Sequence, residues 1–367
     1  MSLPLIPAEV LAKTDKILFI THLALGDFTY LQNDFRAFAA AYPHIEVHLW
    51  VDEVRRTTNA AKWDSLKKYS LYDWVEACPF FGKIYKRTYS PALLEESIRE
   101  AQNEHYPVVV SLATLRPHLY ASMARRISPQ GLVVGMVKKV KFFQPHHAFA
   151  YRKLDATIPP YTVDHNNPQH ISDVYADWFR QLCGLDIPPA ERMPFVHIPA
   201  EWNRYATEQI AQWGTQEKKR VFINPYAKTK KRCWPLERVG ELIVAMRELP
   251  DWRNACFIVN AMPPELPAVK TLIAEQHLDE TVAFSATNNF FQLPAVLARC
   301  DLIVSVETAV MHLANAVHVP VIALMRQKNP EWIPVDHANS IVITAEHRRD
   351  WVDAIPAGRV IDAMKTL

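Results

Sequence analysis

The feature of this sequence that most limits its fold is the alternation of short apolar runs with longer helical patterns. The runs consist mainly of β-branched and aliphatic residues and are bounded by polar or turn residues, which suits strands buried on both faces. They fall at 16–20, 45–50, 107–113, 220–225, 255–260, 301–306 and 320–325. This βαβα rhythm predicts an α/β fold with parallel sheets covered by helices.

The length of the chain predicts two domains, because 367 residues exceed what one hydrophobic core usually supports. A Pro-rich stretch at 186–199 separates the two sets of predicted strands and is the expected linker. We therefore predict a Rossmann-like N-terminal domain over 1–185 and a Rossmann-like C-terminal domain over 200–349. A helix over 350–367 is expected to pack back toward the N-terminal domain. Ligands would bind in a cleft at the carboxyl ends of the strands.

Composition excludes some classes of partner. The 41 Lys and Arg residues nearly balance the 39 Asp and Glu residues, which argues against a protein held on nucleic acid by bulk charge. The five cysteines are scattered and indicate neither a disulfide framework nor a zinc site. The N-terminus lacks the pattern of a secretory signal, and no later stretch reaches membrane-spanning length without polar interruption. We expect a cytoplasmic protein.

Asp27 is the candidate catalytic residue. The segment THLALGDFTYL places it at the carboxyl end of the first predicted strand and at the start of the next helix. A carboxylate in this position would cap the helix. It would also suit a general base that removes a proton from an attacking acceptor hydroxyl. The two roles are compatible, and both stay open at this point.

A basic loop follows the first predicted strand of the C-terminal domain. In PYAKTKKRCWPLERVGEL, a cluster of cations precedes a helix whose expected first residue is Pro235. The cluster consists of Lys228, Lys230, Lys231 and Arg232. Such a loop would attract a diphosphate, which an arginine can bind through two hydrogen bonds. A solvated surface loop would show the same run of charge.

A third segment predicts an anion site at a helix start. The strand ending near Val306 leads directly into a helix that begins at about Thr308. The amides of Thr308, Ala309 and Val310 would then be unpaired and would attract an anion, helped by the helix dipole. His312 lies one turn further on the same face, within reach of that anion. A core histidine satisfied by its neighbours is the alternative.

Common metal and nucleotide motifs are absent from the sequence. It holds no D-x-D pair, which many metal-dependent sugar-nucleotide transferases use, and no H-E-x-x-H. Its eight glycines form neither a G-x-G-x-x-G fingerprint nor a P-loop. We expect no metal and no other cofactor. Protein cations and helix amides would then stabilise any diphosphate leaving group.

Three of these segments together resemble glycosyltransferase family 9, the bacterial lipopolysaccharide heptosyltransferases. They are LALGD after the first strand, the basic loop ending in Trp-Pro, and SVETAVMHLANA at 305–316, and their order and spacing match the family. Weaker similarity runs through 169–188, so the resemblance covers most of the chain. It implies a GT-B fold, in which two Rossmann-like domains face a central cleft. The N-terminal domain would bind the acceptor and the C-terminal domain the donor.

The resemblance also implies the chemistry. The family inverts the anomeric carbon without a metal, and its usual donor is an ADP-activated heptose. Its catalytic aspartate falls on Asp27, and its phosphate-binding lysine falls on Arg232. The donor diphosphate would be held by Lys228, Arg232, Thr308, Ala309, Val310 and His312, and the donor sugar by Glu307.

Three positions depart from the family pattern. Glu307 stands where the family usually has Asp, which lengthens a carboxylate beside the donor sugar. Ala309 replaces Gly and narrows the approach of phosphate or sugar. In RQKNPEWIP, Arg326 and Lys328 bring charge to a turn that is commonly G-P-T-x-P-like. These changes indicate a divergent branch of the family.

Basic segments of the N-terminal domain are candidates for the acceptor site. Lys86, Arg87 and Arg116 lie in such segments, and a further one runs over 137–147. They would suit an anionic glycan or glycolipid such as the lipopolysaccharide inner core, although surface solvation is the more common reason for such segments.

The sequence thus predicts a metal-independent, inverting glycosyltransferase that moves a sugar, as heptose from ADP-heptose, to a lipopolysaccharide-core or related glycan. Its partners would be the nucleotide-sugar donor and an anionic acceptor, with peripheral contact at the cytoplasmic face of the inner membrane and no nucleic acid. Two alternatives remain at this stage. One is a sugar-nucleotide epimerase or hydrolase on the same fold, and the other is a non-catalytic sugar-nucleotide or glycan-binding module.

Overall fold

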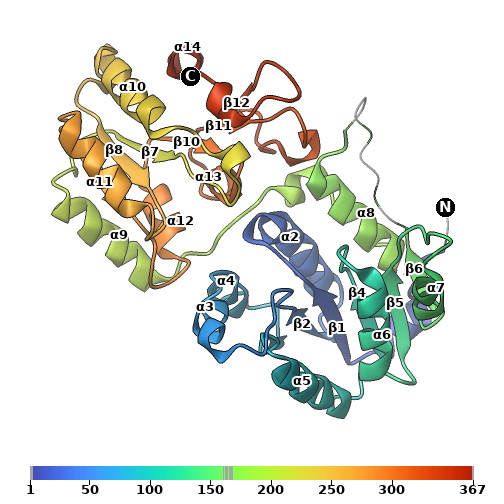
Figure 1. Ribbon diagram of the computed structural model, residues 1–367. Helices are drawn as coiled ribbons and strands as arrows, with labels where there is room; N and C mark the ends of the chain where they lie inside the picture. Colours follow the sequence, from blue (N-terminus) through green and yellow to red (C-terminus); the bar gives the residue numbers. More distant parts are fainter. Residues whose placement is uncertain (1–2, 160, 162–163, 165–167, 366–367) are drawn as a thin grey trace. The chain divides into compact units, whose positions relative to one another are not determined.

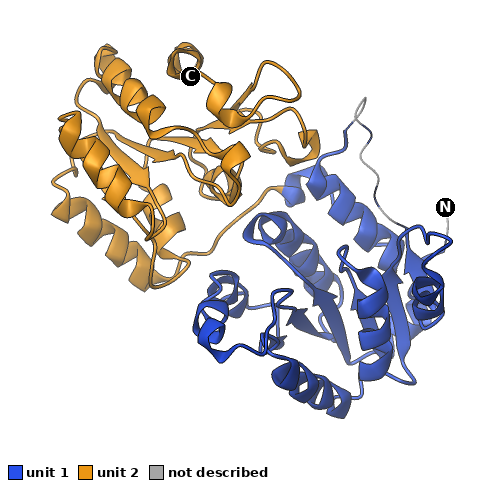
Figure 2. Ribbon diagram, in the orientation of Figure 1, with its two compact units in different colours: residues 1–192 blue, residues 193–367 orange. Residues whose placement is uncertain are grey.

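The computed structural model describes residues 3–159, 161, 164 and 168–365. The chain divides into two compact units, Met1–Arg192 and Met193–Leu367 (Figure 2). The ends of the predicted domains at 1–2 and 366–367 lie outside the described residues. Each unit holds a six-stranded parallel sheet with helices on both of its faces (Figure 1), so the predicted α/β fold of two Rossmann-like units is confirmed.

Unit 1 contains the first sheet, with the strand order β3-β2-β1-β4-β5-β6. Its strands are β1 Lys16–Thr21, β2 Glu46–Val51, β3 Lys83–Tyr85, β4 Val108–Ser111, β5 Leu132–Met136 and β6 Ala156–Ile158. Its helices are α1 Ala8–Leu11, α2 Leu25–Ala41, α3 Trp63–Lys67, α4 Leu71–Glu76, α5 Pro91–Asn103, α6 Pro117–Ile127, α7 Pro145–Tyr151 and α8 Ile171–Cys183, with 3-10 turns η1 Ala60–Lys62 and η2 Pro189–Arg192.

Unit 2 contains the second sheet, with the strand order β12-β11-β10-β7-β8-β9. Its strands are β7 Arg220–Asn224, β8 Cys256–Asn260, β9 Thr281–Phe284, β10 Leu302–Val306, β11 Val321–Met325 and β12 Ser340–Thr344. Its helices are α9 Ala200–Gln212, α10 Leu236–Arg247, α11 Leu266–Glu275, α12 Gln292–Leu297, α13 Ala309–Ala316 and α14 Ala357–Met364, with 3-10 turns η3 Lys230–Arg232, η4 Pro250–Trp252, η5 Pro330–Trp332 and η6 Val352–Ala354.

The two sheets share one topology. Read from its own first strand, each has the order 3-2-1-4-5-6, which is that of the doubly wound dinucleotide-binding fold. The order reverses between β1 and β4 in the first sheet and between β7 and β10 in the second. In open sheets of this kind, ligands bind beside the carboxyl ends of the two strands at which the order reverses. Each unit therefore has one favoured binding edge.

The core of unit 1 lies on both faces of its sheet. Leu18 and Ile20 of β1 pack into one buried cluster with residues of α5 and α6. Phe19 points to the other face, where its ring contacts Phe35 and Phe38 of α2 and Phe179 of α8. This alternation within one strand explains why β1 reads as a continuous apolar run.

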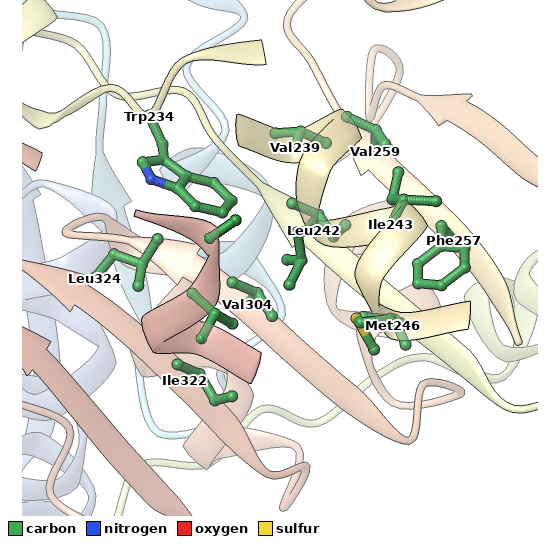
Figure 3. Close-up of a cluster of buried hydrophobic side chains, with 14 of the residues drawn as sticks. Trp234, Val239, Leu242, Ile243, Met246, Phe257, Val259, Val304, Ile322 and Leu324 are labelled. Carbon is green, nitrogen blue, oxygen red and sulfur yellow. The ribbon is translucent and has the colours of Figure 1, made fainter. Parts of the chain in front are cut away.

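The core of unit 2 forms between the second sheet and its helices, including α10 and α14. Figure 3 shows Trp234 beside buried residues of α10, β8, β10 and β11. The Trp234 indole Nε1 donates to the Ile355 carbonyl at 2.8 Å, which satisfies its polar end inside the core. The basic loop before Trp234 is thereby fixed at its end.

The C-terminal helix packs within unit 2. Ala357, Val360 and Met364 of α14 belong to the buried core of this unit, and α14 contacts α10 and β12. From the sequence we expected this helix to pack toward the N-terminal domain. Its apolar face is covered by the second sheet and α10 of unit 2, and a contact with unit 1 stays a prediction.

The boundary between the units falls inside the predicted linker. The first half of that Pro-rich segment is fastened to unit 1, because the Arg192 guanidinium donates to Asp173 and to the Ile187 carbonyl, each at 2.7 Å. Asn33 of α2 also donates to the Arg192 carbonyl at 3.2 Å. The segment from Met193 to Pro199 connects this anchored end to α9.

Helix α8 ends at a glycine. Gly184 has φ 73°, a left-handed conformation that favours glycine, and its amide donates to the Arg180 carbonyl at 2.9 Å. None of the helices in the described part of the chain combines the length and apolarity needed to cross a bilayer.

Candidate functional site

Asp27 lies at the favoured edge of the first sheet, directly after β1. It is the third residue of α2, whose N-cap is Ala24, so it does not occupy the cap position considered from the sequence. Its Oδ2 accepts from the Ala24 amide at 3.1 Å, which is the carboxylate half of a capping box. The Tyr175 hydroxyl of α8 donates to its Oδ1 at 3.0 Å. Asp27 therefore supports the helix start while its carboxylate is held in one orientation.

The surroundings of Asp27 make it a stronger base than an ordinary carboxylate. Burial raises the pKa of Asp27, although hydrogen bonds from Ala24 and Tyr175 oppose the rise. Burial also raises the pKa of Tyr175 well above its ordinary value, so its hydroxyl stays protonated and remains a donor. A half-buried carboxylate with a raised pKa suits proton abstraction near neutral pH.

The other acidic residues at this edge are neutralised by arginines. Asp52 directly follows β2 and is buried, where it forms an ion pair with Arg56 and accepts from the Tyr120 hydroxyl at 2.7 Å. Glu53 is bound by Arg55 through two hydrogen bonds of 2.7 and 2.6 Å. Asp27 forms no ion pair with any described residue. This difference singles it out as the available carboxylate.

His22 joins the two strands at the reversal point of the first sheet. It follows β1, and its Nε2 accepts from the amide of Leu115, which follows β4, at 2.7 Å. Burial lowers the pKa of His22, so the imidazole is neutral with its Nε2 unprotonated. The next residue after Leu115, Arg116, has φ 53° and ψ 48° and precedes α6. Arg116 therefore directly follows a residue that is bonded at this edge, and its acceptor role stays a prediction.

The other two predicted acceptor residues form surface ion pairs. Lys86 is paired with Glu76, and Arg87 is paired with Glu96 at 3.4 Å. Exposed pairs of this kind contribute little to stability and rearrange readily. These ion pairs do not assign the two residues to a site, and their acceptor role stays a prediction.

A chain of amide side chains organises the favoured edge of the second sheet. Asn260 at the end of β8 donates to Asn224 Oδ1, at the end of β7, at 2.8 Å. Asn224 in turn donates to Thr308 Oγ1 at 2.9 Å and to Ser305 Oγ at 3.1 Å. These bonds orient Thr308, the N-cap of α13. This network was not predicted, although an asparagine lies at or next to the end of both predicted strands.

The start of α13 has fewer free amides than the sequence suggested. Thr308 Oγ1 accepts from the Val310 amide at 3.3 Å, so the expectation of three unpaired amides fails at Val310. The amides of Thr308 and Ala309 take no part in this hydrogen bond. An anion at the helix start would therefore be met mainly by these two.

Glu307 lies at the centre of a charged cluster. Its carboxylate is buried and accepts from Arg326 Nε at 3.1 Å, Arg326 Nη2 at 3.2 Å and Asn329 Nδ2 at 2.8 Å. The Arg326 amide adds a longer bond of 3.4 Å. Arg232 Nε lies 3.6 Å from Glu307 Oε1. Two guanidinium groups thus share one carboxylate and leave one net positive charge at this edge.

Two positions that depart from the family pattern, Glu307 and Arg326, contact each other in this cluster. Glu307 and Arg326 are 19 residues apart and form a two-pronged ion pair. The longer side chain of Glu307 is thereby occupied by the arginine of the altered turn. The pairing itself was not predicted, since nothing local in the sequence brings these two positions together.

The remaining cations of the basic loop lie further out. Lys228, Lys230 and Lys231 are exposed, and Lys231 Nζ lies 5.6 Å from the Trp351 ring centre. Arg232 is half-buried with a 39 % exposed side chain. Pro235 is the N-cap of α10 rather than its first helical residue. The loop therefore has one inward arginine and an exposed basic rim.

His312 is buried in α13, with its ring centre 5.9 Å from that of Trp332. This burial fits the core alternative, and its role toward an anion stays a prediction. Within residues 3–159, 161, 164 and 168–365, no three His, Cys, Asp or Glu side chains are arranged to hold a metal ion.

The comparisons with known proteins agree with the fold. The family model described as glycosyltransferase family 9 (heptosyltransferase) matches residues 118–352. The chain is similar to a glycosyltransferase family 9 structure from Veillonella parvula DSM 2008, with 18% identity, 96% of each chain covered and a TM-score of 0.73. No curated protein matches the sequence.

Two Escherichia coli structures are also similar. One is the ADP-heptose lps heptosyltransferase II, with 16% identity, a TM-score of 0.67, and 96% of this chain and 98% of that chain covered. The other is heptosyltransferase WaaC with ADP, with 15% identity, a TM-score of 0.68, and 96% and 99% covered. At these identities the likeness establishes the GT-B fold of the two units.

Proposed function

Because the chain belongs to glycosyltransferase family 9, we propose that it transfers a sugar from a nucleotide-diphosphate donor to an acceptor hydroxyl, inverting the anomeric carbon without a metal. Family membership supports glycosyltransferase activity in general. The proposed donor is ADP-heptose, since two similar structures are heptosyltransferases and one of them contains ADP. The proposed acceptor is a lipopolysaccharide-core or related glycan at the cytoplasmic face of the inner membrane.

The observation that most supports this proposal is the fixed orientation and raised pKa of Asp27. In the transfer step, the acceptor O–H gives its proton to the Asp27 carboxylate while its oxygen bonds to the anomeric carbon. The bond between that carbon and the diphosphate oxygen breaks, and the nucleotide diphosphate leaves with the electron pair. A raised pKa and a fixed orientation favour the proton transfer. A module that only binds a donor has no use for such a base.

The edge of the second sheet supplies the proposed diphosphate site. Arg232 and the amides of Thr308 and Ala309 are assigned to the leaving diphosphate, and Lys228 adds long-range attraction from the exposed rim. The Asn224 network fixes Thr308 in advance, so these donors need little rearrangement when charge develops. Val310 and His312 contribute through the packing of α13 rather than through free donors.

The family resemblance implies that Glu307 contacts the donor sugar, but its hydrogen bonds point to a structural role. A carboxylate offers about four acceptor positions, and the Arg326 and Asn329 bonds occupy four. A donor hydroxyl can reach Glu307 only by displacing one of them, most readily the neutral Asn329. We therefore assign Glu307 primarily to holding Arg326 and Arg232 in place.

The proposal is tested first by nucleotide binding. Thermal stabilisation by ADP, UDP, GDP and CMP identifies the donor base, because a ligand that binds only the folded chain stabilises it by mass action. Incubation of the protein with ADP-heptose, with and without a lipopolysaccharide-core acceptor, then distinguishes a transferase from a hydrolase and from a binding module. We expect ADP release that requires acceptor and yields the inverted glycoside. ADP release without acceptor would indicate a hydrolase, and binding without turnover would indicate a binding module.

Chelation tests the metal-independent mechanism. We expect the rate of transfer to survive exhaustive treatment with EDTA, because the assigned cations belong to the protein. Loss of the activity with EDTA and its return with Mg²⁺ or Mn²⁺ would refute this part of the proposal.

A further inference from the structure

One stretch of unit 1 combines exposed phenylalanines with uncompensated positive charge. Phe142, Phe143 and Phe149 are 97, 59 and 66 % exposed. Lys138, Lys139 and Lys141 lie in the same stretch, which runs from the end of β5 through α7. We call these six residues the aromatic-basic surface. Large exposed apolar side chains gathered in one place usually mark an interaction site.

The charge of this region has one sign. Between Glu104 and Asp155 the sequence contains no Asp or Glu, while it contains eight Lys and Arg residues. Two of the eight pair with carboxylates outside the stretch, Arg125 with Asp155 and Arg126 with Glu95. The three lysines of the aromatic-basic surface form no ion pair with any described residue. Its positive charge is therefore available to a partner.

Contacts made by side chains of α6 and α7 support the aromatic-basic surface. The Lys138 amide donates to the Tyr151 hydroxyl at 3.2 Å, which ties the start of the loop to the end of α7. His147 of α7 stacks on His118 of α6 with ring centres 3.7 Å apart, which docks α7 on its neighbour. The exposed Leu119 follows His118 and extends the apolar area. These contacts place the rings and the lysines on a supported platform rather than on a free tail.

We propose that the aromatic-basic surface binds the interface of an anionic lipid bilayer. Phenylalanine side chains insert at the boundary between headgroups and acyl chains, and lysines attract anionic headgroups, so one partner accounts for both kinds of residue. A water-soluble anionic glycan would use the lysines and leave three aromatic rings in water. A bilayer therefore fits the whole surface, whereas a soluble glycan fits half of it.

The position of the surface gives the binding a consequence for unit 1. All strands of the first sheet are parallel, and the loop at 137–144 begins at the carboxyl end of β5. Asp27 follows the carboxyl end of β1 in the same sheet. When this loop binds a bilayer, the sheet edge that carries Asp27 faces the membrane. The inference does not depend on the sugar transferred.

Vesicle flotation tests the proposal with the full chain. The probes are vesicles of phosphatidylcholine alone and of phosphatidylcholine mixed with phosphatidylglycerol. We expect binding to the anionic vesicles that weakens as salt is added. The triple variant K138Q/K139Q/K141Q should bind about a hundredfold more weakly, at roughly fivefold per lysine near an anionic surface. The variant F142S/F143S/F149S should lose about tenfold or more, since its rings no longer insert.

Matched variants control for net charge and apolarity elsewhere. K13Q/K270Q/K365Q removes three exposed lysines outside the surface, and L3S/V244S/M262S removes three exposed apolar side chains. Both should bind vesicles like the unchanged chain. Thermal unfolding and ADP binding of every variant verify folding. Absence of binding to anionic vesicles, or equal binding by all variants, would overturn the proposal.

A further outcome separates a bilayer from a soluble polyanion. If only the lysine variant lost affinity, and dextran sulfate bound as tightly as vesicles, the surface would be a polyanion site and the bilayer proposal would be wrong. Transfer to a water-soluble acceptor fragment by the unchanged chain tests the proposed function separately, because that fragment needs no bilayer. A defect there would concern the proposed function and not the membrane surface.

Discussion

At the scale of single residues, the environment of each carboxylate decides its role. Asp27 and Asp52 lie at the same edge of the first sheet, yet Asp52 is paired with Arg56 while Asp27 accepts only uncharged donors. Glu307 in the second unit is held by Arg326 and approached by Arg232. The paired carboxylates are occupied by arginines, and Asp27 is the one left available to take up a proton.

Replacement of Asp27 by Asn should abolish transfer. Asn keeps the size of the side chain but cannot take up the acceptor proton. ADP affinity and the melting temperature should stay close to those of the unchanged chain, as measured by titration and thermal unfolding. Asp64→Asn, at an exposed position of α3, is the matched control. Transfer by the Asp27→Asn variant at an undiminished rate would exclude the general-base mechanism.

Removal of the Tyr175 hydroxyl should change the pH dependence of transfer. The bond from Tyr175 lowers the pKa of Asp27, so Tyr175→Phe should raise that pKa further. Activity requires the ionised carboxylate and is lost as the pH falls through its pKa. The acid limb of kcat/KM should therefore move to higher pH in the variant. An unchanged limb would mean that another group controls it.

Replacement of Arg232 by Ala should weaken ADP binding by about 1.5–3 kcal/mol, the scale of a charge-assisted hydrogen bond. Adenosine, which lacks phosphate, should bind almost unchanged. Arg232→Lys should recover part of the loss. Lys230→Ala and Lys231→Ala are the controls, since both lysines are exposed in the same loop. Equal, small and salt-suppressed losses at the three positions would show a merely basic surface.

At the scale of secondary-structure elements, the sequence predicted the central strands and missed those at the edges. The central strands are continuous apolar runs because helices cover both of their faces. The edge strands β3 and β6 have three residues each, too few for a periodic signal, and β9 and β12 are only half-buried. Strand β5 was also missed, and Gly135 interrupts its apolar run.

The residues of the candidate site were likewise predicted where the sequence signal is local and missed where it is not. Asp27, Arg232 and Thr308 were found because each lies between the end of a strand and the end of the first turn of the next α-helix. Their partners were not, since Tyr175 is 148 residues from Asp27 and Arg326 is 19 residues from Glu307. Contacts of this kind depend on the packing of α8 on α2 and on the turn after β11, which no local pattern encodes.

Helix α2 contains a buried acidic residue that should affect stability. Asp34 is buried, its Oδ1 has no hydrogen-bond partner among the described residues, and burial raises its pKa well above the ordinary value. The folded chain therefore keeps a proton that the unfolded chain loses above about pH 4. The contribution of Asp34 to stability is complete below that pH and is lost as the pH rises through the folded-state pKa.

Asp34→Asn should remove this dependence, because its side chain stays neutral at every pH. Thermal unfolding at a series of pH values should show a variant that is more stable than the unchanged chain at neutral and alkaline pH. The gain should disappear in acid. Asp64→Asn, which changes an exposed carboxyl, should show no such trend. A constant difference between variant and unchanged chain across pH would contradict the assignment.

At the scale of the whole molecule, two separate cores imply two unfolding events. Each unit has its own buried cluster around its own sheet, so a single two-state transition is not expected. Calorimetry should resolve two transitions or one transition broader than two-state unfolding allows. ADP should raise the midpoint of one of them, that of unit 2, by mass action. Equal shifts of both would mean that the nucleotide binds across the two units.

The anchoring of Arg192 shortens the free connection between the two halves of the proposed reaction. With the chain fastened to α8 up to that residue, the connection to α9 is the seven residues from 193 to 199, whose reach is at most about 25 Å. Prolines at 194 and 199 stiffen it further. Groups tethered so closely meet as if each were present at a roughly millimolar effective concentration of the other. In the proposed reaction, the encounter of Asp27 with a donor bound to unit 2 would then be an intramolecular event, and dilution of the protein would leave its frequency unchanged.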